Sequence, residues 1–255
     1  MDRGALPKAI LRHLGDCPLE DRTFSGTAGV FFCPQGSGLY LRVNGPGQEE
    51  NHARMTDYFC KKGLGPRLVE YVNDGEHDYL LTQAVPGENA LAPRLLEQPE
   101  RLAAELGKAF RRLHEIRGED IPVQGFSDWF LRETEDFLKN EAIPGKSPEE
   151  FRARYGVTPE QALAALPNIR RYEGDFSLIH GDACLPNVMF SEFAFTGFID
   201  LGAACLGDRH YDLAATLWSL GHNLKSQAYG AVFLDTYGRD FVDEERLALC
   251  ALSWK

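Results

Sequence analysis

The chain has 255 residues, 44% of them hydrophobic, and a formal net charge of −11. This length allows one large domain or two small ones, and the apolar content is sufficient for a packed core. The negative charge argues against a nucleic-acid-binding protein, which needs a basic face for phosphates, and it is compatible with a cationic substrate.

The first third of the chain has the pattern of a small β-rich unit. A stretch of small residues at 25–29 is followed by two apolar runs, Val30–Phe32 and Leu39–Val43, which a turn separates. Small residues allow backbone N–H groups to approach phosphates closely. An ordinary β-meander has the same pattern, so a nucleotide-binding role for this stretch depends on motifs farther along the chain.

A helix is expected over Gln48–Lys62, because apolar residues recur on one face and a glycine follows as a C-terminal stop. Two strands are expected next, over Arg67–Val72 and Tyr79–Gln83. The stretch Ala84–Gly87 breaks this pattern and reads as a linker. We therefore predict an N-terminal unit over residues 1–86 and a C-terminal unit over residues 87–255.

The C-terminal unit has a mainly helical pattern. Apolar residues recur at helical spacing over 99–118 and 127–141. Ser147 and Thr158 each begin a capping box with proline at the first helical position. Three more helices are expected near the end of the chain, at residues 210–224, 226–237 and 243–253.

The strongest functional pattern lies in residues 178–202. A short apolar strand leads to His180-Gly181-Asp182, and Asn187 follows five residues after the aspartate. A second apolar run then turns and returns to end on Asp200. If the turn is centred between residues 193 and 194, Asn187 lies opposite Asp200, with Cβ atoms about 5 Å apart.

An amide and a carboxylate at this separation suit Mg²⁺, which takes one or two protein carboxylates and completes its shell with water and phosphate oxygens. Asp182, on the preceding loop, can accept a proton from a hydroxyl group. A base, an asparagine and an acidic metal ligand in this order are the working parts of phosphoryl transfer in kinases. A buried hairpin with polar turn residues is the alternative interpretation, because Asp and Asn are common turn formers.

Three segments resemble the aminoglycoside 3'-phosphotransferase (kanamycin kinase) family: His180–Asn187, Gly197–Gly202 and Gly207–Ala214. The resemblance runs from about Phe24 to the C-terminus and is strongest after residue 178. It implies an α+β, protein-kinase-like fold of two lobes. The N-terminal lobe would be small and β-rich with one helix, and the C-terminal lobe larger and mainly helical.

The resemblance also implies roles for single residues. Asp182 resembles the catalytic base, and Asn187 and Asp200 resemble the Mg²⁺ ligands. Asp208 is expected near the bound sugar, and Asp212 is expected to brace the catalytic loop. Ser25, Gly26 and Thr27 are implied to cover the phosphates, and Arg42 to neutralise them. Gln83 and Val85 are implied to hold the adenine edge at the hinge, which is the linker at residues 84–87.

Two departures from the family pattern concern the phosphates. Arg42 stands where kinases usually have a lysine, and His52 stands where its glutamate partner is usual, with Glu49 and Glu50 within one turn. Ala203 stands where an arginine commonly follows the Leu-Gly pair. Three interpretations remain: Arg42 binds phosphate with one of the two glutamates as its partner, the nucleotide is held differently and turnover is low, or the protein binds nucleotide without catalysis. We favour the first, because all three catalytic-type residues are present.

A third departure concerns the substrate. The acidic, aromatic tail typical of the family is replaced by Leu249–Lys255, which carries a cationic lysine. Acidic substrate contacts are therefore expected elsewhere, and the candidates are Glu149, Glu150, Glu160 and Asp208. Helix capping or a solvated face is the alternative role for the three glutamates.

The motif and the resemblance together predict a Mg²⁺-dependent phosphotransferase that moves the γ-phosphate of ATP or GTP to a hydroxyl of a small cationic molecule, in particular the 3'-hydroxyl of an aminoglycoside. The alternatives are a kinase of an amino alcohol, a sugar or another antibiotic, and a non-catalytic nucleotide-binding protein.

No nucleic-acid partner is expected, because the net charge is negative. No membrane partner is expected, because no apolar run is long enough to span a membrane. The absence of a signal-peptide core and of any C-x-x-C pair among six cysteines predicts a cytoplasmic protein with free thiols. The oligomeric state is left open.

Overall fold

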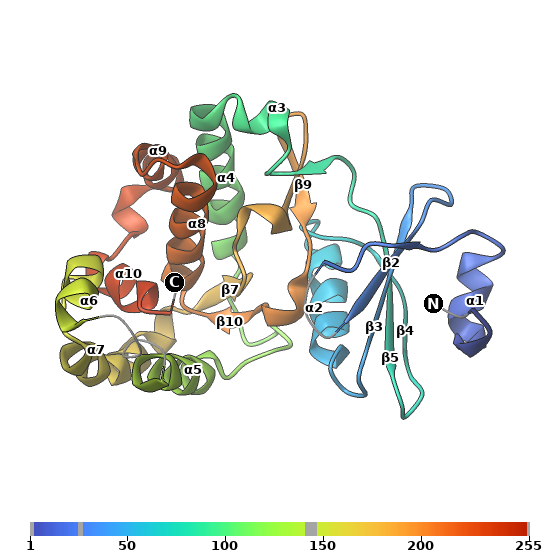
Figure 1. Ribbon diagram of the computed structural model, residues 1–255, viewed down its shortest axis with the longest axis horizontal. Helices are drawn as coiled ribbons and strands as arrows, with labels where there is room; N and C mark the ends of the chain where they lie inside the picture. Colours follow the sequence, from blue (N-terminus) through green and yellow to red (C-terminus); the bar gives the residue numbers. More distant parts are fainter. Residues whose placement is uncertain (1–2, 25–27, 141–146, 254–255) are drawn as a thin grey trace.

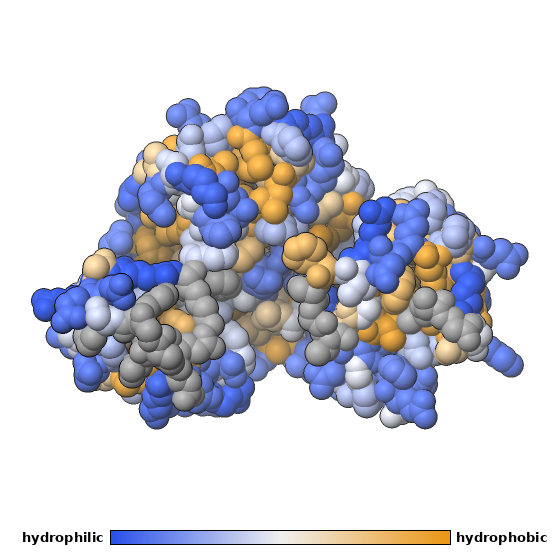
Figure 2. Space-filling view, in the orientation of Figure 1, coloured by the Kyte–Doolittle hydropathy of each residue, from blue (hydrophilic) through white to orange (hydrophobic). Residues whose placement is uncertain are grey.

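The computed structural model describes residues 3–24, 28–140 and 147–253 (Figure 1). A β-sheet with two helices forms one end of the molecule, and a larger, mostly helical part forms the other. The outline of the molecule is indented between these parts, and hydrophilic side chains cover most of its outer rim (Figure 2). The predicted α+β fold of two lobes is therefore confirmed.

The N-terminal lobe is built on a five-stranded antiparallel sheet in the order β1-β2-β3-β5-β4. Its strands are β1 (Glu20–Asp21), β2 (Gly29–Cys33), β3 (Leu39–Asn44), β4 (Leu68–Asn73) and β5 (Asp78–Gln83). Leu41 and Leu81 are register partners, and both lie in a buried apolar cluster with α1 (Lys8–Leu14) on the outer face of the sheet. Since side chains alternate along a strand, Arg42 points to the other face, toward α2 (Glu50–Lys61).

A short linker at residues 84–87 leads from β5 into the C-terminal lobe. There β6 (Glu88–Asn89) joins β8 (Val188–Ser191) and β9 (Ala194–Phe198) in a three-stranded sheet, and β7 (Ser177–Ile179) pairs with β10 (Cys205–Gly207). Gly87 has φ +101°, and a Cβ on it would lie 2.1 Å from the carbonyl oxygen of Phe190. Only glycine fits where the linker meets β8. The domain boundary between residues 86 and 87 stays a prediction.

Helices make up most of the C-terminal lobe (Figure 1). They are α3 (Pro93–Leu96), α4 (Pro99–His114), α5 (Phe126–Asn140), α6 (Pro148–Tyr155), α7 (Pro159–Ala165), α8 (Arg209–Leu224), α9 (Ala228–Tyr237) and α10 (Glu244–Ala251). Both capping boxes are confirmed. The side chains of Ser147 and Thr158 each accept a hydrogen bond from the backbone N–H three residues ahead, and the side chain of that residue accepts one from their own backbone N–H. Among the described residues, no helix is long and apolar enough to cross a membrane.

Helix α4 is the central helix of this lobe and packs closely on α9. Its apolar face is fully buried, as Leu102, Leu106 and Phe110 show. Gly107 permits the close approach, because a Cβ on it would lie 2.6 Å from the carbonyl oxygen of Phe233 on α9. This packing fixes the position of His114 at the end of α4.

We predict that Gly107→Ala destabilises the protein, although alanine normally stabilises a helix interior by about 0.5–1 kcal/mol relative to glycine. The added methyl group meets the backbone of α9, and overpacking of this kind costs about 1–3 kcal/mol. The midpoint of urea unfolding should therefore fall. Gly174→Ala is the matched control, because a Cβ there has no heavy atom within 4 Å. An unchanged or raised midpoint for Gly107→Ala would contradict the close α4–α9 contact.

Candidate active site

The loop after β7 is held by one buried carboxylate. Asp212 on α8 is fully buried and accepts hydrogen bonds from the N–H groups of His180 at 2.6 Å and Gly181 at 2.9 Å. Two backbone donors on one carboxylate fix both the position and the direction of the loop. The expected bracing role of Asp212 agrees with this geometry.

Asp212 is held in turn by His114, which is 2% exposed. The Nε2 of His114 lies 3.1 Å from Asp212, and its Nδ1 lies 3.0 Å from the hydroxyl of Tyr237. Burial lowers the pKa of His114 below 6.5, and Asp212 only partly offsets this effect. We therefore assign a neutral imidazole that donates to Asp212 and accepts from Tyr237. Sequence spacing gives no signal for this trio, because its members lie on three helices or their ends.

Gly181 brings this loop against a segment that comes later in the chain. Its φ is +79°, and a Cβ on it would lie 2.1 Å from the carbonyl oxygen of Ala203. Ala203 ends the short 3₁₀ helix η4 (Leu201–Ala203), which directly follows Asp200. The glycine is therefore required for the close approach of the loop to the backbone beside Asp200.

Asp182 and Asn187 are brought together directly. The Nδ2 of Asn187 donates to the Asp182 carboxylate at 2.9 Å and to its backbone carbonyl at 3.0 Å. The N–H of Asp182 in turn donates to the Nδ1 of His180 at 3.2 Å. Because these bonds use the amide nitrogen of Asn187, its amide oxygen is left as the ligand atom.

The predicted hairpin register is wrong by one residue. Val188 pairs with Phe198, which makes Ile199 the neighbour opposite Asn187, and the N–H of Ile199 donates to the carbonyl of Asn187 at 3.0 Å. The turn lies one position earlier than expected, with Glu192 at φ 56°, and a bulge in β9 adds one residue. Asp200 therefore lies just beyond the last pair rather than opposite Asn187.

Asp200 leaves the strand with φ 58° and ψ 61°. This left-handed conformation costs an ordinary residue roughly 1–2 kcal/mol and redirects the side chain relative to a continuing strand. The side chain is 46% exposed, and one of its oxygens lies 3.6 Å from Nη1 of Arg42. The carbonyl of the preceding residue, Ile199, accepts a hydrogen bond from Nε2 of His180 at 2.9 Å.

Arg42 is paired with Glu49, one of the two predicted partners. Its Nε donates to Glu49 at 2.8 Å, and Asn44 donates to the same oxygen at 2.8 Å. Burial alone raises the pKa of Glu49, but hydrogen bonds from His52, Arg42 and Asn44 outweigh it and lower the pKa from 4.5 to about 2. Glu49 is therefore a carboxylate at neutral pH. Glu50, the other candidate, is exposed at the start of α2.

The donor set at the end of β9 fits a magnesium ion. Among the described residues there is no cluster of three or more His, Cys, Asp or Glu side chains that could hold a metal. Mg²⁺ does not need one, because it takes one or two carboxylates and uses water and phosphate oxygens for the rest. The exposed carboxylate of Asp200 and the amide oxygen of Asn187, which has no hydrogen-bond donor among the described residues, meet this requirement.

The predicted nucleotide residues are only partly described. Ser25, Gly26 and Thr27 lie outside the described residues. The side chain of Gln83 contacts Ser37 and Arg67 rather than turning into the linker. Val85 lies against β9, where a Cβ on Gly197 would be 3.2 Å from it. Gln83 therefore ends β5 just before the linker and Val85 lies within it, and their role at the adenine edge stays a prediction.

The predicted substrate residues are not brought to the catalytic loop. Asp208 is fully buried at the start of α8, where its two oxygens contact His210 and Arg246. Burial alone raises the pKa of Asp208, but these partners outweigh it and lower the pKa, so its charge is already compensated. Glu150 closes the capping box of α6, and Glu149 is exposed on the same helix, far from the N-terminal lobe (Figure 1). The substrate roles of Asp208, Glu149 and Glu150 stay predictions, and the compensated charge of Asp208 argues against its role.

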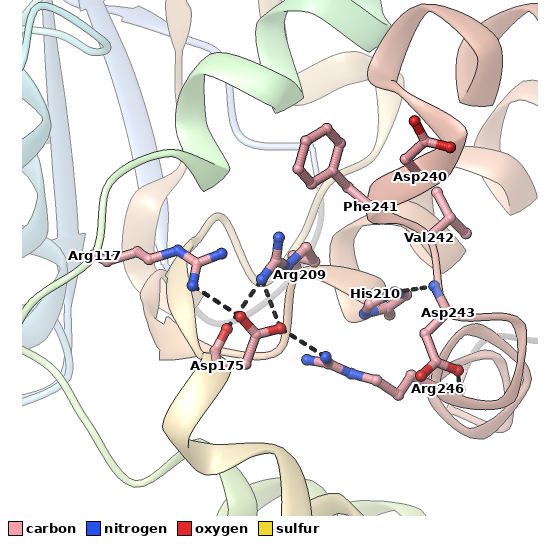
Figure 3. A pocket seen from close by; sticks show the side chains of 9 residues that line it. All are labelled: Arg117, Asp175, Arg209, His210, Asp240, Phe241, Val242, Asp243 and Arg246. Carbon is pink, nitrogen blue, oxygen red and sulfur yellow. Dashed lines mark hydrogen bonds and ion pairs between the residues drawn. The ribbon is translucent and has the colours of Figure 1, made fainter.

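A cavity of about 260 Å³ in the C-terminal lobe is also separate from this loop (Figure 3). In it Arg117, Arg209 and Arg246 converge on the carboxylate of Asp175 at 2.7–2.8 Å. One carboxylate thus joins the segment after α4 to the first turns of α8 and α10. We interpret this cluster as an ion network that holds the lobe together.

Comparisons with known proteins agree with this geometry. Residues 33–250 match the phosphotransferase enzyme family. The chain is 38% identical over 244 residues to a probable aminoglycoside 3'-phosphotransferase of Lactococcus lactis subsp. lactis, an alignment that covers 95% of this chain and 92% of that protein.

Solved structures show the same fold. The crystal structure of a type VIII aminoglycoside-3'-phosphotransferase has a TM-score of 0.70 and 28% identity, covering 98% of this chain and 94% of that one. An aminoglycoside phosphotransferase from Streptomyces rimosus, solved with ADP and streptomycin, has a TM-score of 0.71 and 24% identity over 97% of each chain. The chain therefore belongs to the phosphotransferase enzyme family and, within it, to the aminoglycoside 3'-phosphotransferases.

Proposed function

We propose that this chain transfers the γ-phosphoryl group of ATP or GTP to the 3'-hydroxyl of an aminoglycoside. The observation that carries the proposal is the pairing of Asp182 with Asn187 at 2.9 Å on a loop anchored by Asp212. A carboxylate beside an amide that can offer an oxygen ligand is the arrangement that phosphoryl transfer to a hydroxyl requires. The 38% identical relative is named for the same reaction.

Asp182 acts as the base in this proposal. It accepts a hydrogen bond from the acceptor hydroxyl, orients its oxygen toward the γ-phosphorus, and takes the proton as the new P–O bond forms and the bond to the leaving diphosphate breaks. Asn187 keeps the carboxylate in place through its Nδ2. Since little covalent chemistry is required, most of the rate gain comes from positioning and charge neutralisation.

Asn187 and Asp200 would hold Mg²⁺ when the nucleotide is bound, through an amide oxygen and a carboxylate. The ion would neutralise part of the phosphate charge. The guanidinium of Arg42, next to Asp200, supplies a positive charge for the non-transferred phosphates. Residues 25–29 and the linker backbone at Gln83 and Val85 complete the nucleotide site of the proposal.

The acceptor class rests on charge and on relatives. A net charge of −11 favours a cationic substrate over an anionic one. The S. rimosus protein, which has the same fold, was solved with ADP and streptomycin. The six cysteines are free thiols, which suits the reducing cytoplasm as the location of the enzyme.

We expect turnover of ATP or GTP with kanamycin in the presence of Mg²⁺, measured as nucleoside diphosphate release and as a phosphorylated product by mass spectrometry. Asp182→Asn should lower kcat by about 10²–10⁴-fold, because it removes the base without changing the size of the side chain. Nucleotide affinity should change little. Asp235→Asn, on the exposed face of α9, is the matched control and should keep full activity.

A panel of aminoglycosides, amino alcohols and sugars separates the proposal from its alternatives. Turnover confined to an amino alcohol or a sugar would replace the aminoglycoside with another acceptor. Nucleotide binding without any turnover would identify a non-catalytic protein. Full activity of Asp182→Asn would exclude Asp182 as the base.

Arg42 provides a second test. We predict that Arg42→Lys preserves or raises activity, because it keeps the positive charge, whereas Arg42→Met raises the KM for the nucleotide by about tenfold or more. Arg12→Met, an exposed position on α1 at the outer face of the sheet, is the control. If Arg42→Lys loses as much activity as Arg42→Met, charge is not the contribution of Arg42.

A further inference from the structure

The peptide groups on both sides of Asp200 are held by histidines. The carbonyl of Ile199, before it, accepts from Nε2 of His180 at 2.9 Å, and the N–H of Leu201, after it, contacts Nε2 of His52 at 3.1 Å. Asp200 itself has the left-handed conformation, which persists only where surrounding contacts enforce it. The two imidazoles are such contacts.

The protonation of His52 follows from its partners. A backbone N–H can only donate, so Nε2 of His52 accepts from Leu201 and carries no proton. The ring proton is therefore on Nδ1, which lies 2.8 Å from the carboxylate of Glu49 and donates to it. His52 is 8% exposed and Glu49 is 2% exposed, so water competes little for either bond.

These bonds close a ring around the proposed metal ligand. Glu49 binds His52 with one oxygen and Arg42 with the other, and Nη1 of Arg42 lies 3.6 Å from Asp200. The ring thus passes from β3 through α2 to the segment after β9 and back. It joins the N-terminal lobe to the part of the C-terminal lobe that would hold Mg²⁺.

We propose that His52 is a positioning residue for phosphoryl transfer, which sets Asp200 by holding the N–H of Leu201. His52 stands at the helix position where the family pattern has a glutamate, and in this chain Glu49 pairs with Arg42 instead. The imidazole then has a different task, which is to fix the distance between α2 and η4. The ring also lies against Gly202, where a Cβ would be 3.6 Å from Nδ1. This inference rests on the proposed function.

Two amide variants separate the two bonds of His52. In His52→Gln the amide oxygen can occupy the place of Nε2 and still accept from Leu201. In His52→Asn the shorter amide can occupy the place of Nδ1 and donate to Glu49, but it does not reach Leu201. Both variants bury one amide, so they differ mainly in which contact they keep.

We expect His52→Asn to lower kcat by about tenfold or more, because a small displacement of a reacting group costs this much, while the KM for kanamycin stays within about threefold. His52→Gln should retain kcat within about threefold. The gain in affinity that Mg²⁺ gives to a fluorescent ATP analogue, measured by titration without the acceptor, should shrink in His52→Asn and persist in His52→Gln. Thermal unfolding of both variants confirms that they fold.

The proposal is overturned if His52→Asn keeps wild-type kcat and Mg²⁺-dependent nucleotide affinity, or if the two variants lose activity and affinity equally. The titration does not need an acceptor. A wild-type protein that binds the analogue with Mg²⁺ but turns over no aminoglycoside therefore contradicts the proposed function while the test of His52 still gives its answer.

Discussion

A single buried carboxylate determines where this enzyme's chemistry can take place. Asp212 is surrounded by the core of the C-terminal lobe, and its charge is compensated by the N–H groups of His180 and Gly181 and by His114. Moving the loop would leave this charge buried without its donors, which is strongly unfavourable. Asp182, one residue beyond these donors, is therefore held in place through its backbone, and its carboxylate accepts a hydrogen bond from Asn187 on the same loop.

The position of Asp200, the proposed metal ligand, depends on contacts between the lobes rather than on the core. Asp200 is exposed and has a strained backbone, and it is held through its two neighbours by His180 and His52. One of these histidines belongs to the catalytic loop and the other to α2. The position of the proposed metal ligand thus depends on both lobes at once, which is appropriate for a residue that must meet a nucleotide bound between them.

Local patterns in the sequence predicted the fold well, whereas long-range contacts could not be predicted. Both capping boxes and the start of α4 at Pro99 follow from spacing and from residue preferences within one segment. The hairpin register failed because a left-handed Glu192 and a bulge in β9 each shift the pairing, and neither has a sequence signal. The burial of Asp208 could not be predicted, because its partner Arg246 lies 38 residues away. The contact of His52 with Leu201 spans 149 residues and could be found only in three dimensions.

The family relationship and the geometry support each other but depend on different residues. The motif assigns Asp182, Asn187 and Asp200, and the structure adds the side chains that hold them. A crystal structure with a non-hydrolysable ATP analogue, Mg²⁺ and kanamycin would test the account most directly. We predict that Mg²⁺ is bound by the amide oxygen of Asn187 and the carboxylate of Asp200, with Asp182 hydrogen-bonded to the 3'-hydroxyl. A metal held by other side chains, or a kanamycin hydroxyl that does not meet Asp182, would contradict it.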